Sequence, residues 1–167
     1  MTELVTRVMD AMCALYAGDA RRIQHFTKVH AYAARIALGE GLCEADRERV
    51  EIAALTHDIG IHLCEELFNG RCDGKLQEQE GPALAEPLLA DLGVAPAVRD
   101  RVCFLIAHHH TYTGVDGLDW RILLEADFLV NGLEDGMGRE ALCNGYHRIF
   151  ETKTGRQLFT WMFGMTL

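Results

Sequence analysis

The side chains of this chain that could do chemistry are histidines and aspartates on otherwise apolar helical faces. His57 ends an apolar stripe with i, i+3, i+4, i+7 spacing, and Asp58 follows it directly. His109 ends a similar apolar stripe, and Asp127 lies within the apolar stripe of another helix. His25 lies one helical turn before the apolar residues of a further helix. Any one of these alone is expected to be a hydrogen-bonded core residue. Together they predict a cluster, because buried carboxylates are costly unless a partner such as a cation compensates them.

Imidazole and carboxylate donors suit a divalent transition metal, namely Fe, Mn, Ni, Co or Zn. The six cysteines include no CxxC pair, which argues against a zinc-thiolate site. We therefore predict that one or two such ions are the cofactor.

The elements that position these residues are predicted to be helices, because the hydrophobic periodicity is helical almost throughout. Pro87 is expected to kink or split the fourth helix. Residues 60–77 and 110–117 are predicted to be loops, the first with at most one short helical turn. We predict an all-α, compact single-domain bundle of about 6–8 helices over residues 1–167, with helices at about 3–17, 20–38, 44–58, 80–92, 96–109 and 119–134 and one or two more within 139–165.

Composition narrows the classes of partner. The 16 Lys and Arg against 25 Asp and Glu give a net charge of −9, which disfavours a nucleic-acid polymer as a partner. There is no signal-peptide pattern and no apolar run near the ~20 residues needed to span a bilayer. We expect a cytoplasmic protein with reduced thiols and no membrane partner.

Three motifs occur in the order of a known family. Residues 53–60, AALTHDIG, resemble the AALLHDIG signature of the HD superfamily of metal-dependent phosphohydrolases. Residues 22–25, RIQH, resemble its first-histidine motif, and residues 124–129, LEADFL, resemble its closing AD.L motif. The resemblance covers about residues 20–135, with the helices of 139–165 expected to pack on that core. It implies a helical bundle in which the first metal is ligated by His25, His57, Asp58 and Asp127.

Two further segments resemble dinuclear branches of this superfamily. Glu80 precedes Gly81-Pro82 at a place where those relatives have histidine, and a run of three histidines ends a later apolar stripe. We expect Glu80 and His109 to complete a second metal position, with His108 the next candidate and His110 at the start of the loop. Which of the three histidines is the ligand stays open at this point. The resemblance also implies that Asp58 can bridge two ions.

The residues after the signature depart from many relatives, which carry a lysine there. This chain has Ile61 and His62 instead. His62 and Lys75 are weak candidates for substrate binding, and Arg71 is the other nearby cation. Ordinary solvated surface charge is the simpler interpretation of all three.

The resemblance implies hydrolysis of a phosphoester or phosphoanhydride bond in a small, nucleotide-like phosphorylated substrate. A metal-activated water would attack, and Asp58 would be the catalytic residue that orients it or takes its proton. Two alternatives stay open: a di-iron oxygenase of the HD fold, and a non-catalytic sensing module. The sequence names no particular substrate and leaves a homodimer open.

Overall fold

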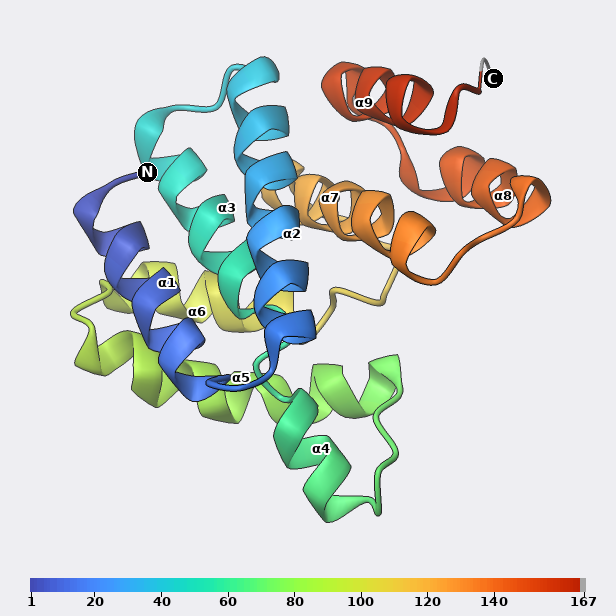
Figure 1. The fold of residues 1–167 in the computed structure, drawn as a ribbon. Coiled ribbons are helices and arrows are strands. Elements are labelled where there is room, and N and C mark those ends of the chain that lie inside the picture. The colour runs from blue at the N-terminus through green and yellow to red at the C-terminus, as the bar shows by residue number, and fades with distance from the viewer. Residues whose placement is uncertain (166–167) are drawn as a thin grey trace.

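The computed structural model describes residues 1–165, which form nine α-helices and no strand (Figure 1). None of these helices is long and apolar enough to cross a membrane. The helices, in chain order, are α1 Glu3–Leu15, α2 Ala20–Gly39, α3 Glu44–Thr56, α4 Ile61–Leu67, α5 Gly74–Asp91, α6 Pro96–Ile106, α7 Leu118–Glu134, α8 Arg139–Ile149 and α9 Lys153–Phe163.

Helices α2, α3 and α7 form the centre of the molecule. Helix α2 packs against both α3 and α7, and α3 also contacts α1, α6 and α7 (Figure 1). The face of α3 toward these neighbours contains Ala53 and Ala54, both fully buried. Because alanine side chains are short, neighbouring helices can approach this face closely. The three helices therefore bring their polar core residues within reach of one another.

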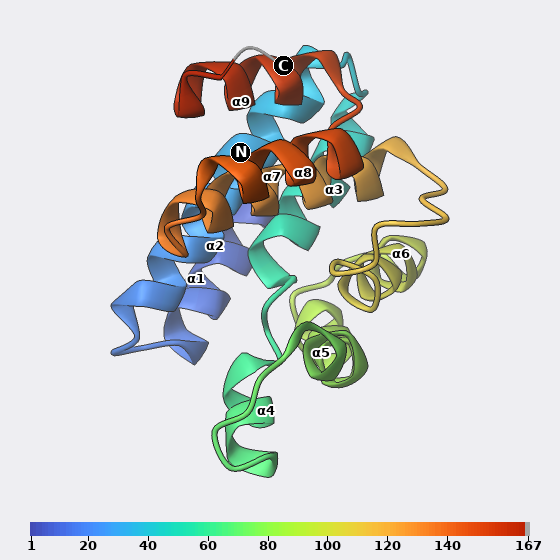
Figure 2. The same cartoon turned by 90° about the vertical axis from the view of Figure 1, so that its right-hand side faces the viewer.

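Helices α5 and α6 pack side by side, with the turn after α3 above them (Figure 2). Two glycines allow this contact. A Cβ atom on Gly60 would lie 3.0 Å from the backbone nitrogen of Gly81, and one on Gly81 would lie 2.6 Å from Ile106 Cγ2. The glycine that follows the His-Asp pair is thus required by backbone packing against α5.

A buried carboxylate connects α7 to the segment between α8 and α9. Glu125 is fully buried and accepts hydrogen bonds from the backbone N–H groups of Glu151 and Thr152, at 2.7 and 2.9 Å, and from the Thr152 hydroxyl at 2.5 Å. Burial raises the pKa of this carboxyl group, although the bonds from Thr152 and Glu151 oppose the shift. Helix α9 also packs against α2 and α7.

The all-helical fold class is confirmed, with local corrections between residues 60 and 77 and at Pro87, where the expected kink or split is wrong. Residues 61–67 form α4, and α5 begins at Gly74 rather than near residue 80. Asp73 caps α5 early, since its side chain accepts from the N–H groups of Lys75 and Leu76. Helix α5 also runs through Pro87 without a break. Pro87 is exposed, so water can satisfy the carbonyl that it leaves unpaired.

Candidate metal centre

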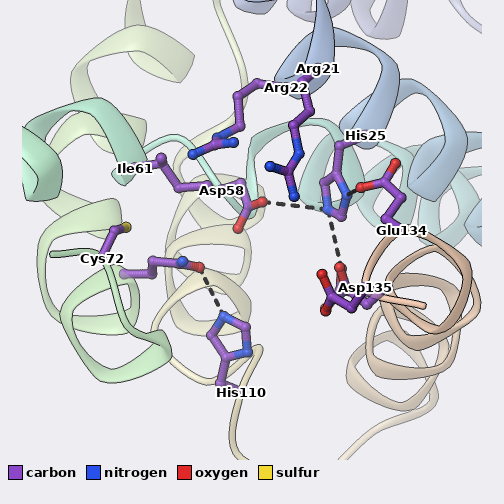
Figure 3. A pocket seen from close by; sticks show the side chains of 12 residues that line it. Arg21, Arg22, His25, Asp58, Ile61, Cys72, His110, Glu134 and Asp135 are labelled. Atoms are coloured by element: carbon purple, nitrogen blue, oxygen red, sulfur yellow. Dashed lines mark hydrogen bonds and ion pairs between the residues drawn. The ribbon is translucent and has the colours of Figure 1, made fainter. Parts of the chain in front are cut away.

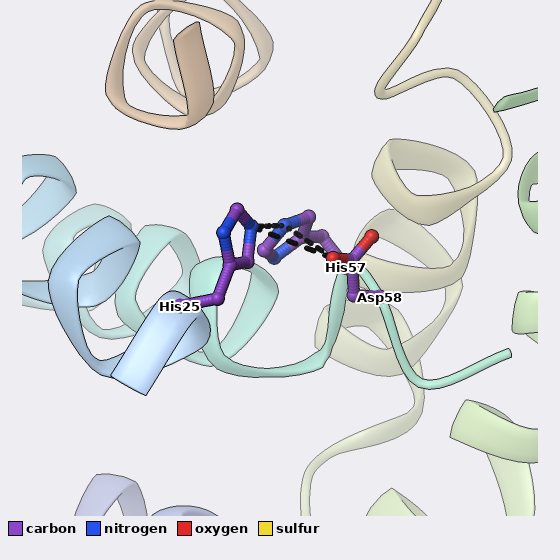
Figure 4. A group of neighbouring side chains, drawn as sticks. All are labelled: His25, His57 and Asp58. Atoms are coloured by element: carbon purple, nitrogen blue, oxygen red, sulfur yellow. Dashed lines mark hydrogen bonds and ion pairs between the residues drawn. The ribbon is translucent and has the colours of Figure 1, made fainter. Parts of the chain in front are cut away.

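Four predicted ligands converge at the meeting point of the central helices. His25 lies in α2, His57 and Asp58 lie in the turn that ends α3, and Asp127 lies in α7. His25, His57 and Asp127 are buried, and Asp58 is half-buried. His25, His57 and Asp58 each offer a donor atom to one group that could hold a metal ion (Figure 4).

The donor atoms of His25, His57 and Asp58 lie at nearly equal separations, and Asp127 approaches both histidines. The Nε2 atoms of His25 and His57 are 3.3 Å apart. Asp58 Oδ2 lies 3.4 Å from the first nitrogen and 3.5 Å from the second. Asp127 Oδ1 lies 3.3 and 3.5 Å from the same two nitrogens. Bonds of ~2.1 Å to a tetrahedral ion place its ligands about 3.4 Å apart. The separations among His25, His57 and Asp58 therefore fit a small divalent cation.

Hydrogen bonds at the Nδ1 atoms of the histidine rings determine whether the Nε2 atoms, which face the cluster, can bind a metal. His57 Nδ1 donates to the Ala54 carbonyl at 2.8 Å, and His25 Nδ1 donates to Glu134 Oε2 at 3.0 Å. In the neutral rings each Nε2 then carries a lone pair, which is the form that binds a metal. Asp127 Oδ1 is buried and has no hydrogen-bond partner within residues 1–165. Lone pairs and carboxylate oxygens that face one point are the donor set of a cation site.

The charges of the cluster also support a cation site. Burial opposes a positive charge on His57, yet the nearby Asp58 and Asp127 carboxylates outweigh it and raise the pKa of His57 to about 9. Burial likewise opposes ionisation of both aspartates, but the pKa of each is lowered by His57 and a second neighbouring histidine. The cluster thus attracts positive charge, and a divalent ion would displace the protons that otherwise supply it.

A second group shares Asp58 with the first. Asp58, His109 and His110 also offer donor atoms that lie within 4.8 Å of one another. His109 Nε2 is 3.5 Å from Asp58 Oδ1, the carboxylate oxygen that does not face His25 and His57. Gln77 Oε1 lies 3.3 Å from His109 Nε2 and 2.8 Å from His110 Nε2. Burial and the neighbouring His109 lower the pKa of His110 to about 4, which leaves this ring neutral at pH 7.

Three predicted ligands lie outside both groups of donor atoms: Asp127, Glu80 and His108. Asp127 Oδ1 still lies 3.3 and 3.5 Å from the two nitrogens of the first group. Glu80 is half-buried, and the side chain of α5 that reaches the histidines is Gln77, one turn earlier. Gln77 takes this place instead of Glu80 because α5 starts earlier than expected. The His108 ring stacks on Phe104, and its Nδ1 donates to the Phe104 carbonyl at 2.7 Å. His110 takes the place expected for His108, because α6 ends at Ile106 and helical phase no longer applies beyond it.

A cavity of about 330 Å³ opens beside the cluster (Figure 3). Arg21 and Arg22 extend into it from α2, and Glu134 and Asp135 line it from the end of α7. Its lining also includes His25, Asp58, Ile61, Cys72, Gln77, His110, Asp127 and Asn131.

The two weak substrate candidates lie outside this lining. His62 is exposed, contacts Asp19 Oδ2 at 3.0 Å and packs against the Tyr16 ring. Lys75 is exposed in the first turn of α5. The arginines of the cavity were not among the predicted site residues, although Arg22 begins the RIQH motif. Glu134 was not predicted either, and its i+7 spacing from Asp127 is the sequence signal that could have indicated it.

The fold and the site define an all-helical protein in which Asp58 and histidines from α2 and from the turns after α3 and α6 form two groups that could hold metal. Residues 22–131 match the HD domain, so the chain belongs to the HD domain family. It is also similar to the crystal structure, at 1.45 Å resolution, of a predicted HD superfamily hydrolase from an uncultured Thermotogales bacterium. That similarity has a TM-score of 0.68 and 24% sequence identity, and covers 95% of this chain and 84% of the other. A search of curated proteins found no match.

Proposed function

We propose that this protein is a metal-dependent phosphohydrolase acting on a small, nucleotide-like phosphorylated substrate. The observation that carries the proposal is the convergence of His25 Nε2, His57 Nε2, Asp58 Oδ2 and the unpartnered Asp127 Oδ1 beside a cavity. Membership of the HD domain family supports it, since that resemblance implies metal-dependent hydrolysis.

Asp58 is the residue of this cluster best placed to act on a reacting group. A bound divalent ion would supply a nucleophilic water at neutral pH and stabilise charge on the phosphoryl oxygens. Asp58 is half-buried and lines the cavity, whereas His57 is almost fully buried. Its carboxylate can therefore orient the attacking water or accept its proton. His25, His57 and Asp127 would hold the ion.

The walls of the cavity favour a phosphorylated substrate. Arg21 and Arg22 provide guanidinium groups, which bind phosphate oxygens well, on the same side of the cavity as Asp58 (Figure 3). Arg22 is held in place by an ion pair with Glu65 at 2.8 Å. The volume of about 330 Å³ lies at the lower end of the range for ligand pockets, which favours a small molecule.

The first prediction tests this activity directly. Protein purified anaerobically and loaded with Mn²⁺ or Fe²⁺ should release phosphate from at least one member of a panel of phosphorylated metabolites. Asp58→Asn should lower kcat/KM on that substrate at least ~100-fold, the range for a lost acid or base. Asp100→Asn, an exposed residue of α6, is the matched control and should stay within about twofold of wild type. A metal-loaded protein that cleaves none of the panel would contradict the proposal.

The second group of donors favours one other candidate, a di-iron oxygenase. Asp58, His109 and His110 could hold a second ion close to the first, as that chemistry requires. The same iron-loaded samples distinguish the two functions. A mixed-valence EPR signal with substrate-dependent oxygen consumption would support the oxygenase, whereas phosphate release without oxygen uptake would support hydrolysis.

A further inference from the structure

His25 differs from the other histidines of the centre in what holds its ring. His57 Nδ1 donates to the carbonyl of Ala54 at 2.8 Å, and His109 Nδ1 donates to the carbonyl of Ile106 at 2.6 Å. Both rings lie just beyond a helix end, where the carbonyls of the last turn have no helical partner. Each can therefore be oriented by its own backbone.

His25 has no such local partner. It lies inside α2, where the carbonyls of the preceding turn are used by the helix itself. Its Nδ1 instead donates to Glu134 Oε2, 3.0 Å away at the end of α7. The other carboxylate oxygen, Glu134 Oε1, accepts from the ammonium group of Lys28, one turn along α2 from His25.

We propose that Glu134 is a positioning residue that aims His25 at the metal. It holds the ring in the tautomer with the proton on Nδ1, which leaves the Nε2 lone pair directed at His57, Asp58 and Asp127. A carboxylate behind a metal-bound histidine also makes that histidine a stronger ligand. Lys28 keeps the carboxylate in place. The inference rests on the metal site of the proposed function, but not on the identity of the substrate.

The alternative is an ordinary ion pair between α2 and α7. The Glu134 side chain is only 17% exposed and that of Lys28 is 41% exposed. An ion pair whose lysine is exposed to solvent contributes little to stability. If the pair were the whole role of Glu134, removing either partner would have the same effect. If Glu134 positions His25, the two substitutions should have different effects, since only Glu134 contacts the His25 ring.

The test is titration of the metal-free protein with Mn²⁺ by calorimetry. Glu134→Ala should weaken Mn²⁺ binding about 10–100-fold, as expected when such a partner is lost. Glu134→Gln keeps an acceptor for the ring and should recover part of that loss. Lys28→Met should change affinity at most about fivefold. Nitrogen-15 NMR of the metal-free proteins, at a pH high enough for the ring to be neutral, should show the Nδ1–H tautomer of His25 in wild type and Glu134→Gln, and its loss in Glu134→Ala.

Asp100→Asn is the control, because Asp100 is an exposed acid of α6 that lies outside the cavity lining. It should stay within about threefold of wild type, since its charge is screened by solvent. Thermal melts of the metal-free variants identify any that fail to fold. Unchanged affinity in Glu134→Ala, or an equal loss in Lys28→Met, would overturn this inference alone. Wild type that binds no Mn²⁺, Fe²⁺ or Co²⁺ would overturn the metal site of the proposed function as well.

Discussion

At the scale of the residue, Asp127 illustrates how burial turns an ordinary carboxylate into a ligand. One of its oxygens is buried with no hydrogen-bond partner among residues 1–165, a state that is costly unless a cation supplies the missing interaction. The nearest groups to that oxygen are the Nε2 atoms of His25 and His57. The interaction that the carboxylate lacks within the protein is therefore one that a metal ion can provide.

The prediction at this scale concerns Asp127→Asn. The amide keeps the shape of the side chain but removes the charge, so we expect Mn²⁺ affinity to fall at least ~100-fold, more than for a residue that acts through a ligand. Calorimetry and metal analysis of the same samples measure it, with Asp100→Asn as control. Full metal content together with full turnover in Asp127→Asn would mean that Asp127 is only a structural core acid.

At the scale of the element, α7 serves two sites from two faces. Asp127 faces the metal centre, whereas Glu125, two residues earlier, faces the segment that connects α8 to α9. Residues two apart on a helix point in different directions, so one helix can hold both contacts. The Glu125 carboxylate leaves no room for a side chain at Gly155, where a Cβ atom would lie 1.9 Å from Oε2. This close contact ties the start of α9 to α7.

Glu125→Ala should therefore loosen the C-terminal helices without touching the metal donors. It leaves the backbone N–H groups of Glu151 and Thr152 without their acceptor and creates a cavity, which should cost about 2–4 kcal/mol of unfolding free energy. Urea unfolding of the metal-free protein measures this loss. Glu140→Ala, an exposed acid in the first turn of α8, is the control and should cost under ~1 kcal/mol. Equal losses of unfolding free energy in the two variants would show that the buried contacts of Glu125 do not add to stability.

At the scale of the whole molecule, a metal at the centre would join two consecutive helices to a third that lies much further along the chain. Its donors come from α2, from the end of α3 and from α7, which also pack against one another. An unfolded chain does not hold these donors together, so binding should favour the folded state.

Metal removal should consequently lower the melting temperature. At a free Mn²⁺ concentration 100 times the Kd, the folded state should gain about 2.7 kcal/mol, or roughly 5–10 °C in Tm for a domain of this size. Scanning calorimetry before and after chelation measures the shift. Asp127→Asn should show almost none at the same Mn²⁺ concentration. A shift of equal size in that variant would mean that the stabilising metal binds elsewhere.

The sequence by itself determined the fold class and most of the helices. Hydrophobic periodicity is a local property, so it located the helices that hold His25, His57 and Asp127, and the AALTHDIG motif marked the turn that joins two of the ligands. The packing of these helices then brought the side chains together.

Only the tertiary structure decided which neighbours complete the site. Helical phase tells which side of one helix a residue is on, but not which other helix it faces. A cap at Asp73 moved the start of α5 and brought Gln77, not Glu80, to the histidines. Because α6 ends at Ile106, His110 and not His108 joins His109 in the second group of donor atoms. Glu134 and Arg21 belong to segments about 110 residues apart that meet only because α2 packs on α7, and sequence spacing cannot encode that contact.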